Sequence, residues 1–306
     1  MFSRRFPFSD PDGRYQLSSL EFNLAYSCNL RCEHCDHFSP YFPAPESADG
    51  NEISLSGFTE SIMHLAPHVS VEDFFFLGGE PLLNKKIGFF VEALKKSGLA
   101  QKTWLVTNGF LLLRQPLSLL KQFDCIRIVV YKSNPLPAST LTEIERLCRG
   151  AGIKLLLYHF SHFHRSFVSR RHEKGFAKKI FLTCSLAWQQ KCFTLYNGHL
   201  CRCSRIPFIS TRLKKLGLVE KEFLEKDSLK IEPGREMREK IPHYFTSTET
   251  PESCFYCLAR MGKADPHRQL TDHDVRDEIW QEVRAKDSVD IFDLNKKYYS
   301  RLLFPK

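Results

Sequence analysis

The first 160 residues alternate short apolar runs with stretches of helical periodicity, and this alternation restricts the fold more than any other feature. Strands that are apolar on both faces are typical of a parallel sheet covered by helices. Residues 87–94 place apolar side chains at i, i+3, i+4 and i+7, and Gly98 follows as a stop signal. The pattern predicts an α/β domain with an open sheet or a complete or partial barrel. The predicted strands are Glu21–Ala25, Asp73–Leu77, Thr103–Thr107, Cys125–Tyr131 and Ile153–Tyr158.

The regular alternation ends near residue 160. An Asn-Gly turn between two short runs predicts a β-hairpin over residues 193–203. An amphipathic helix is expected to begin near Thr271. We therefore predict a core domain of residues 1–180 and a smaller module of residues 181–306. The apolar face of the late helix would consist of Val275, Ile279, Trp280 and Val283.

The composition excludes a wholly disordered chain, since 42% of the 306 residues are hydrophobic. No run approaches 18 apolar residues and the N-terminus lacks an apolar signal core, so we expect a cytoplasmic protein that does not enter a membrane. The net charge of +9 suggests an anionic partner without naming it. The basic run 170–179 is interpreted as a solvated helix face rather than a nucleic-acid site, because it lacks interleaved aromatic residues.

Three cysteines follow the first predicted strand with the spacing CxxxCxxC, at Cys28, Cys32 and Cys35. Thiolates are soft ligands that suit zinc and iron–sulfur clusters, and a reducing compartment favours metal sites over disulfides. A four-iron cluster held by three cysteines keeps one iron open to a substrate or cofactor. The alternative is a structural zinc site with His34 or His37 as the fourth ligand.

The CxxxCxxC spacing resembles the signature of the radical S-adenosylmethionine (radical SAM) superfamily. Gly78-Gly79-Glu80-Pro81 ends the second strand where that family carries its GGEP motif, and Thr107-Asn108-Gly109 ends the third as the family's TNG often does. The resemblance spans roughly residues 20–160 and implies a partial (β/α)6 barrel of the TIM type. The residues that it implies for cofactor binding are His34, Gly78, Gly79, Glu80, Thr107, Asn108 and Ser133.

The resemblance also implies a reaction. A reduced [4Fe-4S] cluster on the three cysteines passes one electron to S-adenosylmethionine, and the resulting 5′-deoxyadenosyl radical removes hydrogen from a substrate carbon. An electron donor such as flavodoxin or ferredoxin would be a partner. No Ser/His/Asp triad or pair of carboxylates is needed, and the sequence shows no convincing one.

A second set of cysteines lies in the predicted C-terminal module. Cys184 and Cys203 bound a C-x13-G-x4-C pattern, and Cys254 and Cys257 form a CxxC pair. Four thiolates complete an iron–sulfur cluster and keep no position open, which favours electron transfer or a structural role. The pattern resembles the SPASM/Twitch modules that follow radical SAM domains. A full SPASM module has a further cysteine where this chain has Lys263, so the resemblance implies the shorter Twitch form with one auxiliary iron–sulfur cluster.

The identity of these four ligands is less determined than their number. Cys192 and Cys201 compete with Cys184 and Cys203. Cys201 and Cys203 should point to opposite faces of a strand, so we expect one of them to be a ligand and favour Cys203. A zinc site on the same thiols is the alternative. The cysteines interpreted as small buried residues are Cys125 and Cys148.

Candidate catalytic residues follow the fifth predicted strand, at the end where active sites form in α/β folds. They would contact an anionic or hydroxylated substrate or transfer protons near pH 7, and the alternative is an exposed polar loop. Residues 36–40, next to the first cysteines, are expected to line the same pocket. The candidates are His159, His162, His164 and Arg165.

We predict hydrogen abstraction from a small polyhydroxylated molecule such as a sugar, nucleotide sugar or aminocyclitol. The auxiliary cluster would accept an electron, so that the net outcome is an oxidation. This preference depends on the single auxiliary cluster, the His- and Arg-rich segment and the positive charge. One alternative is a radical SAM enzyme that modifies peptides. A remote alternative is a zinc-stabilised nucleic-acid-binding protein without enzymatic activity.

Overall fold

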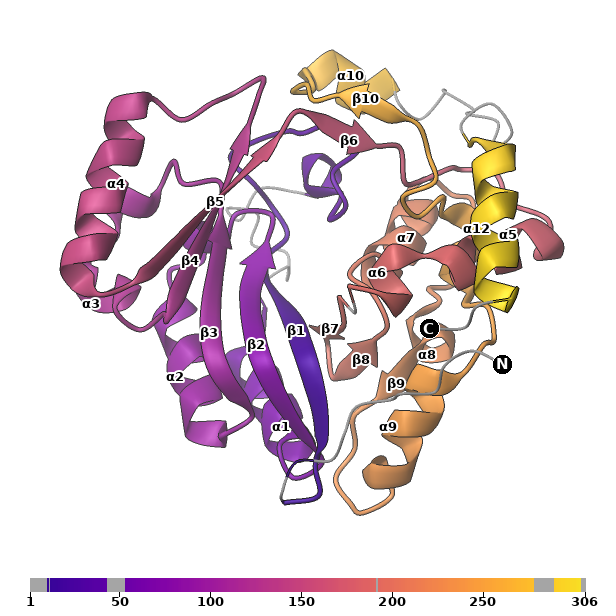
Figure 1. Cartoon of the computed structure of the whole chain (residues 1–306), viewed down its shortest axis with the longest axis horizontal. Coiled ribbons are helices and arrows are strands. Elements are labelled where there is room, and N and C mark those ends of the chain that lie inside the picture. Colours follow the sequence, from indigo (N-terminus) through magenta and orange to yellow (C-terminus); the bar gives the residue numbers. More distant parts are fainter. Residues whose placement is uncertain (1–9, 11, 43–52, 191, 278–288, 304–306) are drawn as a thin grey trace.

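A mostly parallel sheet with helices on its outer face forms the centre of the molecule (Figure 1). The computed structural model describes residues 10, 12–42, 53–190, 192–277 and 289–303. Its main sheet has eight strands in the order β5-β4-β3-β2-β1-β7-β8-β9. The parallel strands up to residue 160 are β1 Tyr15–Ala25, β2 Val69–Gly78, β3 Ala100–Thr107, β4 Cys125–Tyr131 and β5 Lys154–Phe160.

The predicted α/β fold is confirmed, and all five predicted strands are present. The sheet is consistent with a partial barrel, and it does not close among the described residues. β1 begins six residues before the predicted strand, because Tyr15–Leu20 also pair with β2. The segment 15–20 alternates in burial, so it lacks the continuous apolar run that marks the rest of the strand.

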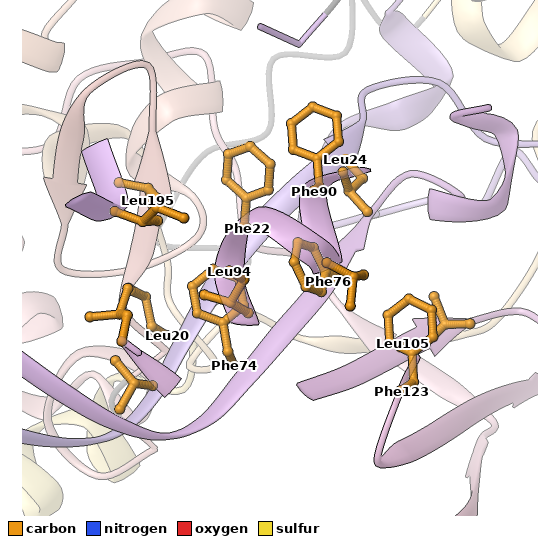
Figure 2. Packing of buried hydrophobic residues seen from close by; sticks show 14 of the residues in the cluster. Leu20, Phe22, Leu24, Phe74, Phe76, Phe90, Leu94, Leu105, Phe123 and Leu195 are labelled. Atoms are coloured by element: carbon orange, nitrogen blue, oxygen red, sulfur yellow. The ribbon is translucent and has the colours of Figure 1, made fainter. Parts of the chain in front are cut away.

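The main hydrophobic core lies between the sheet and the helices α1 (Leu55–Leu65), α2 (Ile87–Ser97) and α4 (Ala138–Ala151). Figure 2 shows Phe22 of β1 next to Phe90 of α2, with Phe74 and Phe76 of β2 in the same cluster. The rings of Phe22 and Phe90 are 5.7 Å apart. Helix α2 buries its predicted apolar face and ends at Gly98, whose φ of 63° suits glycine. This packing fixes the sheet edge from which the functional loops project.

The opposite face of the sheet carries a smaller apolar group. Phe75 and Leu77 alternate with the core phenylalanines along β2 and cluster with Trp104 and Cys125. Cys125 is 4% exposed, and Cys148 is 1% exposed in the main core. Both cysteines are therefore small buried residues, as predicted.

The predicted hairpin is present as β7 (Thr194–Tyr196) and β8 (His199–Cys201), joined by Asn197 and Gly198 at positive φ. Strand β7 pairs in parallel with β1, and β8 pairs with β9 (Ser228–Lys230). The main sheet thus continues across the domain boundary predicted near residue 180. The division into two domains stays a prediction.

Two details of the segment after β5 differ from the sequence analysis. His162–His164 follow β5 as predicted, but they form a short strand, β6, rather than the exposed polar loop that was the alternative, and β6 pairs antiparallel with β10 (Ala264–Pro266). His159 does not follow the fifth strand but lies within it. The pairing brings the C-terminal part of the chain over the edge of the sheet, where β10 and β6 lie side by side (Figure 1).

The late helix α10 (Asp272–Asp277) begins one residue after Thr271, whose hydroxyl accepts a hydrogen bond from the Asp274 N–H. Ile279, Trp280 and Val283 lie outside the described residues. No helix in the described ranges is long and apolar enough to cross a lipid bilayer. The other helices are η1 Ser39–Tyr41, η2 Pro81–Leu83, η3 Leu112–Arg114, α3 Leu117–Leu120, α5 Lys174–Thr183, α6 Ser185–Trp188, α7 Ile206–Lys215, α8 Leu224–Asp227, α9 Met237–Thr246, η4 Glu252–Tyr256 and α12 Ile291–Leu303.

Candidate functional site

A cavity of ≈ 260 Å³ lies at the carboxyl ends of β1 to β4. The first three cysteines line it together with the segments that follow each of these strands. Parallel strands end at one edge of the sheet, so residues far apart in sequence meet there. The lining residues that the sequence predicts are Cys28, Cys32, Cys35, His34, Gly78, Gly79, Thr107, Asn108, His162 and His164.

Hydrogen-bond donors contact two of the first three thiols. The backbone N–H of Leu30 donates to Cys28 Sγ at 3.4 Å, and Gln269 Nε2 donates to Cys32 Sγ at 3.4 Å. Burial, with a smaller effect from Cys35, raises the pKa of the Cys32 thiol to about 12. Donors to the sulfur stabilise a thiolate and tune a metal centre that it binds. The loop therefore offers hydrogen bonds to ligating thiolates, whose negative charge a bound metal would compensate.

A single metal ion fits these side chains less well than a cluster. Among the described residues, no three His, Cys, Asp or Glu side chains are close enough to bind one ion. His34 lines the cavity, but its Nε2 atom is 3.1 Å from Asp265 Oδ2 and so already has a partner. Three thiols around a cavity of this size suit a larger cofactor, and the structure gives no support to the Cys₃His zinc site.

The segment Arg31–Glu33 is held by the C-terminal part of the chain. Leu270 N–H donates to Arg31 O at 2.7 Å, and Arg268 binds both carboxylate oxygens of Glu33. Cys32 and Gln269 form an isolated β-bridge. These contacts order the loop that carries the thiols, and no local pattern in the sequence predicts them.

The two glycines after β2 allow the close approach of two backbone segments. Gly79 N–H donates to Ala25 O at 2.7 Å, and Glu80 N–H donates to Ser27 O at 3.0 Å. A Cβ atom on Gly78 would lie 2.4 Å from Ala25 O, and one on Gly79 would lie 2.0 Å from Ser27 O. Both distances are far below a van der Waals contact, so the turn requires glycine.

Replacing Gly79 with alanine is expected to lower the free energy of unfolding by at least about 3 kcal/mol, because the clash is with backbone atoms. Denaturant unfolding of the metal-free, reduced protein measures this loss. Gly150→Ala is the matched control: it lies in α4 with nothing within 4 Å of the added atom and should stabilise by up to about 1 kcal/mol. Equal stability of the parent and Gly79→Ala would contradict the packing described.

Glu80 connects the ends of β2 and β3 from a fully buried position. Its carboxylate accepts hydrogen bonds from Thr107 Oγ1 at 2.7 Å, Asn108 N–H at 3.0 Å and Leu82 N–H at 3.1 Å. Asn108 in turn donates to Asn29 Oδ1 at 2.7 Å, next to Cys28. Glu80 does not itself line the cavity. It positions the groups that do, and its predicted contact with a ligand amine stays a prediction.

Burial raises the pKa of Glu80 from 4.5 to about 7, although its three hydrogen bonds oppose the shift. A carboxyl that is less acidic in the folded state stabilises the protein most below about pH 4.5, and this contribution is lost as the pH rises to about 7. Relative to Glu80→Gln, we expect the free energy of unfolding of the parent to fall between about pH 4.5 and pH 7. The fall should be about 1.4 kcal/mol for each unit by which folding raises the pKa of Glu80. Urea unfolding at several pH values tests the slope, and identical slopes would contradict the raised pKa.

Ser133 lies behind the cavity wall rather than in it. Its Oγ atom is 2.8 Å from His267 Nδ1, and the His267 ring stacks on Tyr131 with centroids 4.6 Å apart. Tyr131 lines the cavity, whereas Ser133 does not. The predicted cofactor contact of Ser133 therefore has no direct geometric support. His267 was missed by the sequence analysis, because its partner is far away in the chain.

The candidate catalytic residues divide between three environments. His162 and His164 line the cavity, as do Asp36, His37 and Ser39 from the predicted segment 36–40. Arg165 lines a neighbouring cavity of ≈ 310 Å³ that adjoins the first at His34 and Cys35. Its Nη2 atom donates to Asp265 Oδ2 at 3.4 Å. His159 is exposed on β5 and lines neither cavity. Its catalytic role is not supported by its position.

The second set of cysteines also converges. Cys184, Cys203, Cys254 and Cys257 line one small cavity of ≈ 20 Å³, and they come from the α5–α6 junction, the segment after β8, and η4 and the residue that follows it. Burial is the main cause that raises the pKa of the Cys254 thiol, followed by the nearby thiols of Cys257, Cys203 and Cys184. All eleven cysteines are free of disulfides.

The competing cysteines do not line this second cavity. Cys201 is fully buried at the end of β8, and Cys203 faces the cavity two residues later. Cys192 hydrogen-bonds within its own segment, to Gln190 Oε1. The structure therefore brings together the four thiols that the spacing favoured.

Residues 22–152 match the family model described as the Radical SAM superfamily. One curated relative is a GTP 3′,8-cyclase of Xanthomonas campestris pv. campestris (strain B100), 30% identical over 124 residues, which are 40% of this chain and 36% of that protein. Another is an S-adenosylmethionine-dependent nucleotide dehydratase of Selenomonas ruminantium, 28% identical over 120 residues, covering 38% and 40%. The chain therefore spans well under half of the length of these relatives.

Solved structures with a similar fold include BtrN in complex with AdoMet and 2-DOIA, with 14% identity, a TM-score of 0.45 and coverage of 76% of this chain and 82% of that one. Native anSMEcpe with bound AdoMet has 11% identity, a TM-score of 0.46 and coverage of 93% and 96%. Likeness at this level carries no argument about function.

Proposed function

We propose that this protein is a radical SAM enzyme that cleaves S-adenosylmethionine reductively and removes hydrogen from a substrate carbon. One observation carries the proposal: Cys28, Cys32 and Cys35 share a cavity with the Gly78-Gly79 turn, within a segment that matches the radical SAM family. The similarity to the two curated relatives supports the chemistry rather than a particular product.

The residues present fit a [4Fe-4S] cluster on Cys28, Cys32 and Cys35 beside S-adenosylmethionine. Together these two groups supply the electron transfer and the organic radical when bound. Leu30 N–H and Gln269 donate to the sulfurs and hold the thiols in place. Gly78 and Gly79 line the cavity and let their turn pack directly against the backbone of Ala25 and Ser27, next to the loop that carries the thiols. Leu77 contributes an apolar side chain to the cavity lining next to the glycine turn.

The proposed substrate is a small polar molecule with an anionic group, such as a nucleotide, nucleotide sugar or sugar derivative. His162, His164 and Arg260 line the cavity next to the cysteine loop and offer hydrogen bonds and positive charge. The net charge of +9 favours approach of an anion. The names of the two curated relatives also refer to nucleotides, which supports this class of substrate.

We further propose that Cys184, Cys203, Cys254 and Cys257 hold one auxiliary iron–sulfur cluster in a Twitch-like module. Their common cavity supports a centre with four thiolate ligands and no open position. Such a centre would accept the electron of the substrate radical, which makes the net reaction an oxidation. A flavodoxin or ferredoxin would supply the electron needed at the first cluster.

Anaerobic reconstitution with iron and sulfide tests the proposal. With dithionite and S-adenosylmethionine, the protein should form 5′-deoxyadenosine, detected by mass spectrometry. Carbon-deuterated sugar phosphates, nucleotide sugars and peptides should then be compared, since the true substrate class transfers deuterium into 5′-deoxyadenosine. Zinc in place of iron after reconstitution, with no 5′-deoxyadenosine, would exclude the enzyme. Deuterium transfer from a peptide alone would exclude the proposed substrate class.

A further inference from the structure

Arg205 lies between the two cysteine sites and lines both cavities. Its side chain is 2% exposed. Nε and Nη2 donate to Asp36 Oδ1 at 3.1 and 2.8 Å, and Nη1 donates to Cys257 Sγ at 3.7 Å. Asp36 directly follows Cys35 in the first loop. One buried guanidinium thus touches the loop of the first site and a thiol of the second.

The charges around Arg205 explain how a buried cation is tolerated. Burial by itself lowers the pKa of its guanidinium, but Asp36 and the thiols of Cys257, Cys184 and Cys203 outweigh this effect and raise it. A buried charge needs such partners, since an uncompensated one is strongly destabilising. The position is therefore built for a negatively charged surrounding, and four thiolates with a metal centre provide one.

We propose that Arg205 is a positioning residue that sets the charge balance, and hence the reduction potential, of the centre on the second set of thiols. Its hydrogen bond and positive charge stabilise the more negative, reduced state, because donors to sulfur and nearby charge tune such centres. Asp36 opposes this effect by taking up part of the same charge. The inference depends on the four-thiolate centre of the proposed function and goes beyond it by linking that centre to the loop after Cys35.

The pair makes a prediction that a purely structural contact does not. Arg205→Gln removes the charge next to Cys257 and should make the second centre harder to reduce. Asp36→Asn leaves the Arg205 charge uncompensated and should make the same centre easier to reduce. If the ion pair between Arg205 and Asp36 were purely structural, both variants would lose stability, but the reduction potential of the second centre would not shift in opposite directions.

Arg202 is the matched control for Arg205. It is also a buried arginine of the same segment, is 3% exposed and lines the same small cavity. It donates to the backbone carbonyls of Ser247 and Tyr244 and packs its guanidinium over Trp188. Arg202→Gln removes an equal charge without removing a bond to Cys257 or Asp36. Arg202→Gln should shift the midpoint potential by less than half as much as Arg205→Gln does, and this shift should be the same with and without Asp36→Asn.

The experiment uses the full chain with Cys28, Cys32 and Cys35 replaced by alanine, so that only the second site can hold iron. Iron content and midpoint potential are measured after anaerobic reconstitution. Arg205→Gln should lower the equilibrium constant for one-electron reduction at least tenfold, which equals 59 mV. Asp36→Asn should shift the potential upward, and this effect should disappear in the double variant. Arg205→Lys, which keeps the charge, should have a midpoint potential between those of Arg205→Gln and the parent.

The proposal would be overturned if Arg205→Gln and Asp36→Asn shifted the midpoint potential in the same direction or left it unchanged. It would also be overturned if Arg202→Gln shifted the potential as much as Arg205→Gln does. If Arg205→Gln fails to fold, Arg205→Lys and Asp36→Asn still decide the sign. If the triple cysteine variant binds no iron, the proposal falls, since there is no second centre to tune. Formation of 5′-deoxyadenosine by the unmodified chain would still stand in that case, so the two failures are distinguishable.

Discussion

Replacing Cys32 with alanine should reduce formation of 5′-deoxyadenosine to the level seen without protein. Cys32 is 7% exposed, lines the cavity with Cys28 and Cys35, and receives a hydrogen bond from Gln269. Loss of one of three thiolate ligands leaves a [4Fe-4S] cluster without a complete protein site. Mass spectrometry of anaerobic reactions, together with iron analysis, measures both losses.

Cys148→Ala serves as the control for the loss of a buried thiol. Cys148 is 1% exposed in the main core on α4, away from both cavities. This variant should keep its iron and its 5′-deoxyadenosine yield, with a stability change within about 1.5 kcal/mol. Full iron content and full activity in Cys32→Ala would remove Cys32 from the proposed ligand set.

Replacing Cys254 with alanine should abolish product formation while some cleavage of S-adenosylmethionine continues. Cys254 lines the second cavity and not the first, so the site of cofactor cleavage keeps its residues. Without an electron acceptor the substrate radical cannot be oxidised, and the reaction becomes uncoupled. The ratio of 5′-deoxyadenosine to product, measured in one reaction mixture, reports this change.

Cys201→Ala is the matched control for the second site. Cys201 is fully buried on β8, two residues from Cys203, yet it does not line the cavity. The ratio of 5′-deoxyadenosine to product should therefore match the parent. A parent-like ratio in a folded Cys254→Ala variant, verified by circular dichroism, would contradict the electron-transfer role.

Local periodicity was enough to predict the elements of the central sheet. β4 has the predicted bounds, and helix α2 buries its predicted face and ends at Gly98. These elements have an apolar pattern that a short window reveals. β6 was missed because its three residues bury little, and they form a strand only by pairing with β10 some 100 positions later.

The candidate site, like the sheet, could be predicted from the sequence only in part. The spacing of Cys28, Cys32 and Cys35 predicted the first group of thiols, because a short loop brings near neighbours together. The second group was predicted from its resemblance to SPASM/Twitch modules. The partners of those thiols were not predictable: Gln269 lies 237 positions from Cys32, and Arg205 lies 169 positions from Asp36. The contact of Glu80 with a ligand amine stays a prediction, and the hydrogen bonds that its buried carboxylate accepts from Thr107 and Asn108 were not predicted.

The sequence by itself determined the α/β pattern, the first set of thiols and the glycine turn, since each depends on residues close together in the chain. Only the tertiary structure decided which four cysteines share the second cavity, and that Arg205 joins the two sites. The physical reason is that these contacts arise where separate segments pack at the same sheet edge. Their selection depends on burial and charge compensation in three dimensions, which no local pattern encodes.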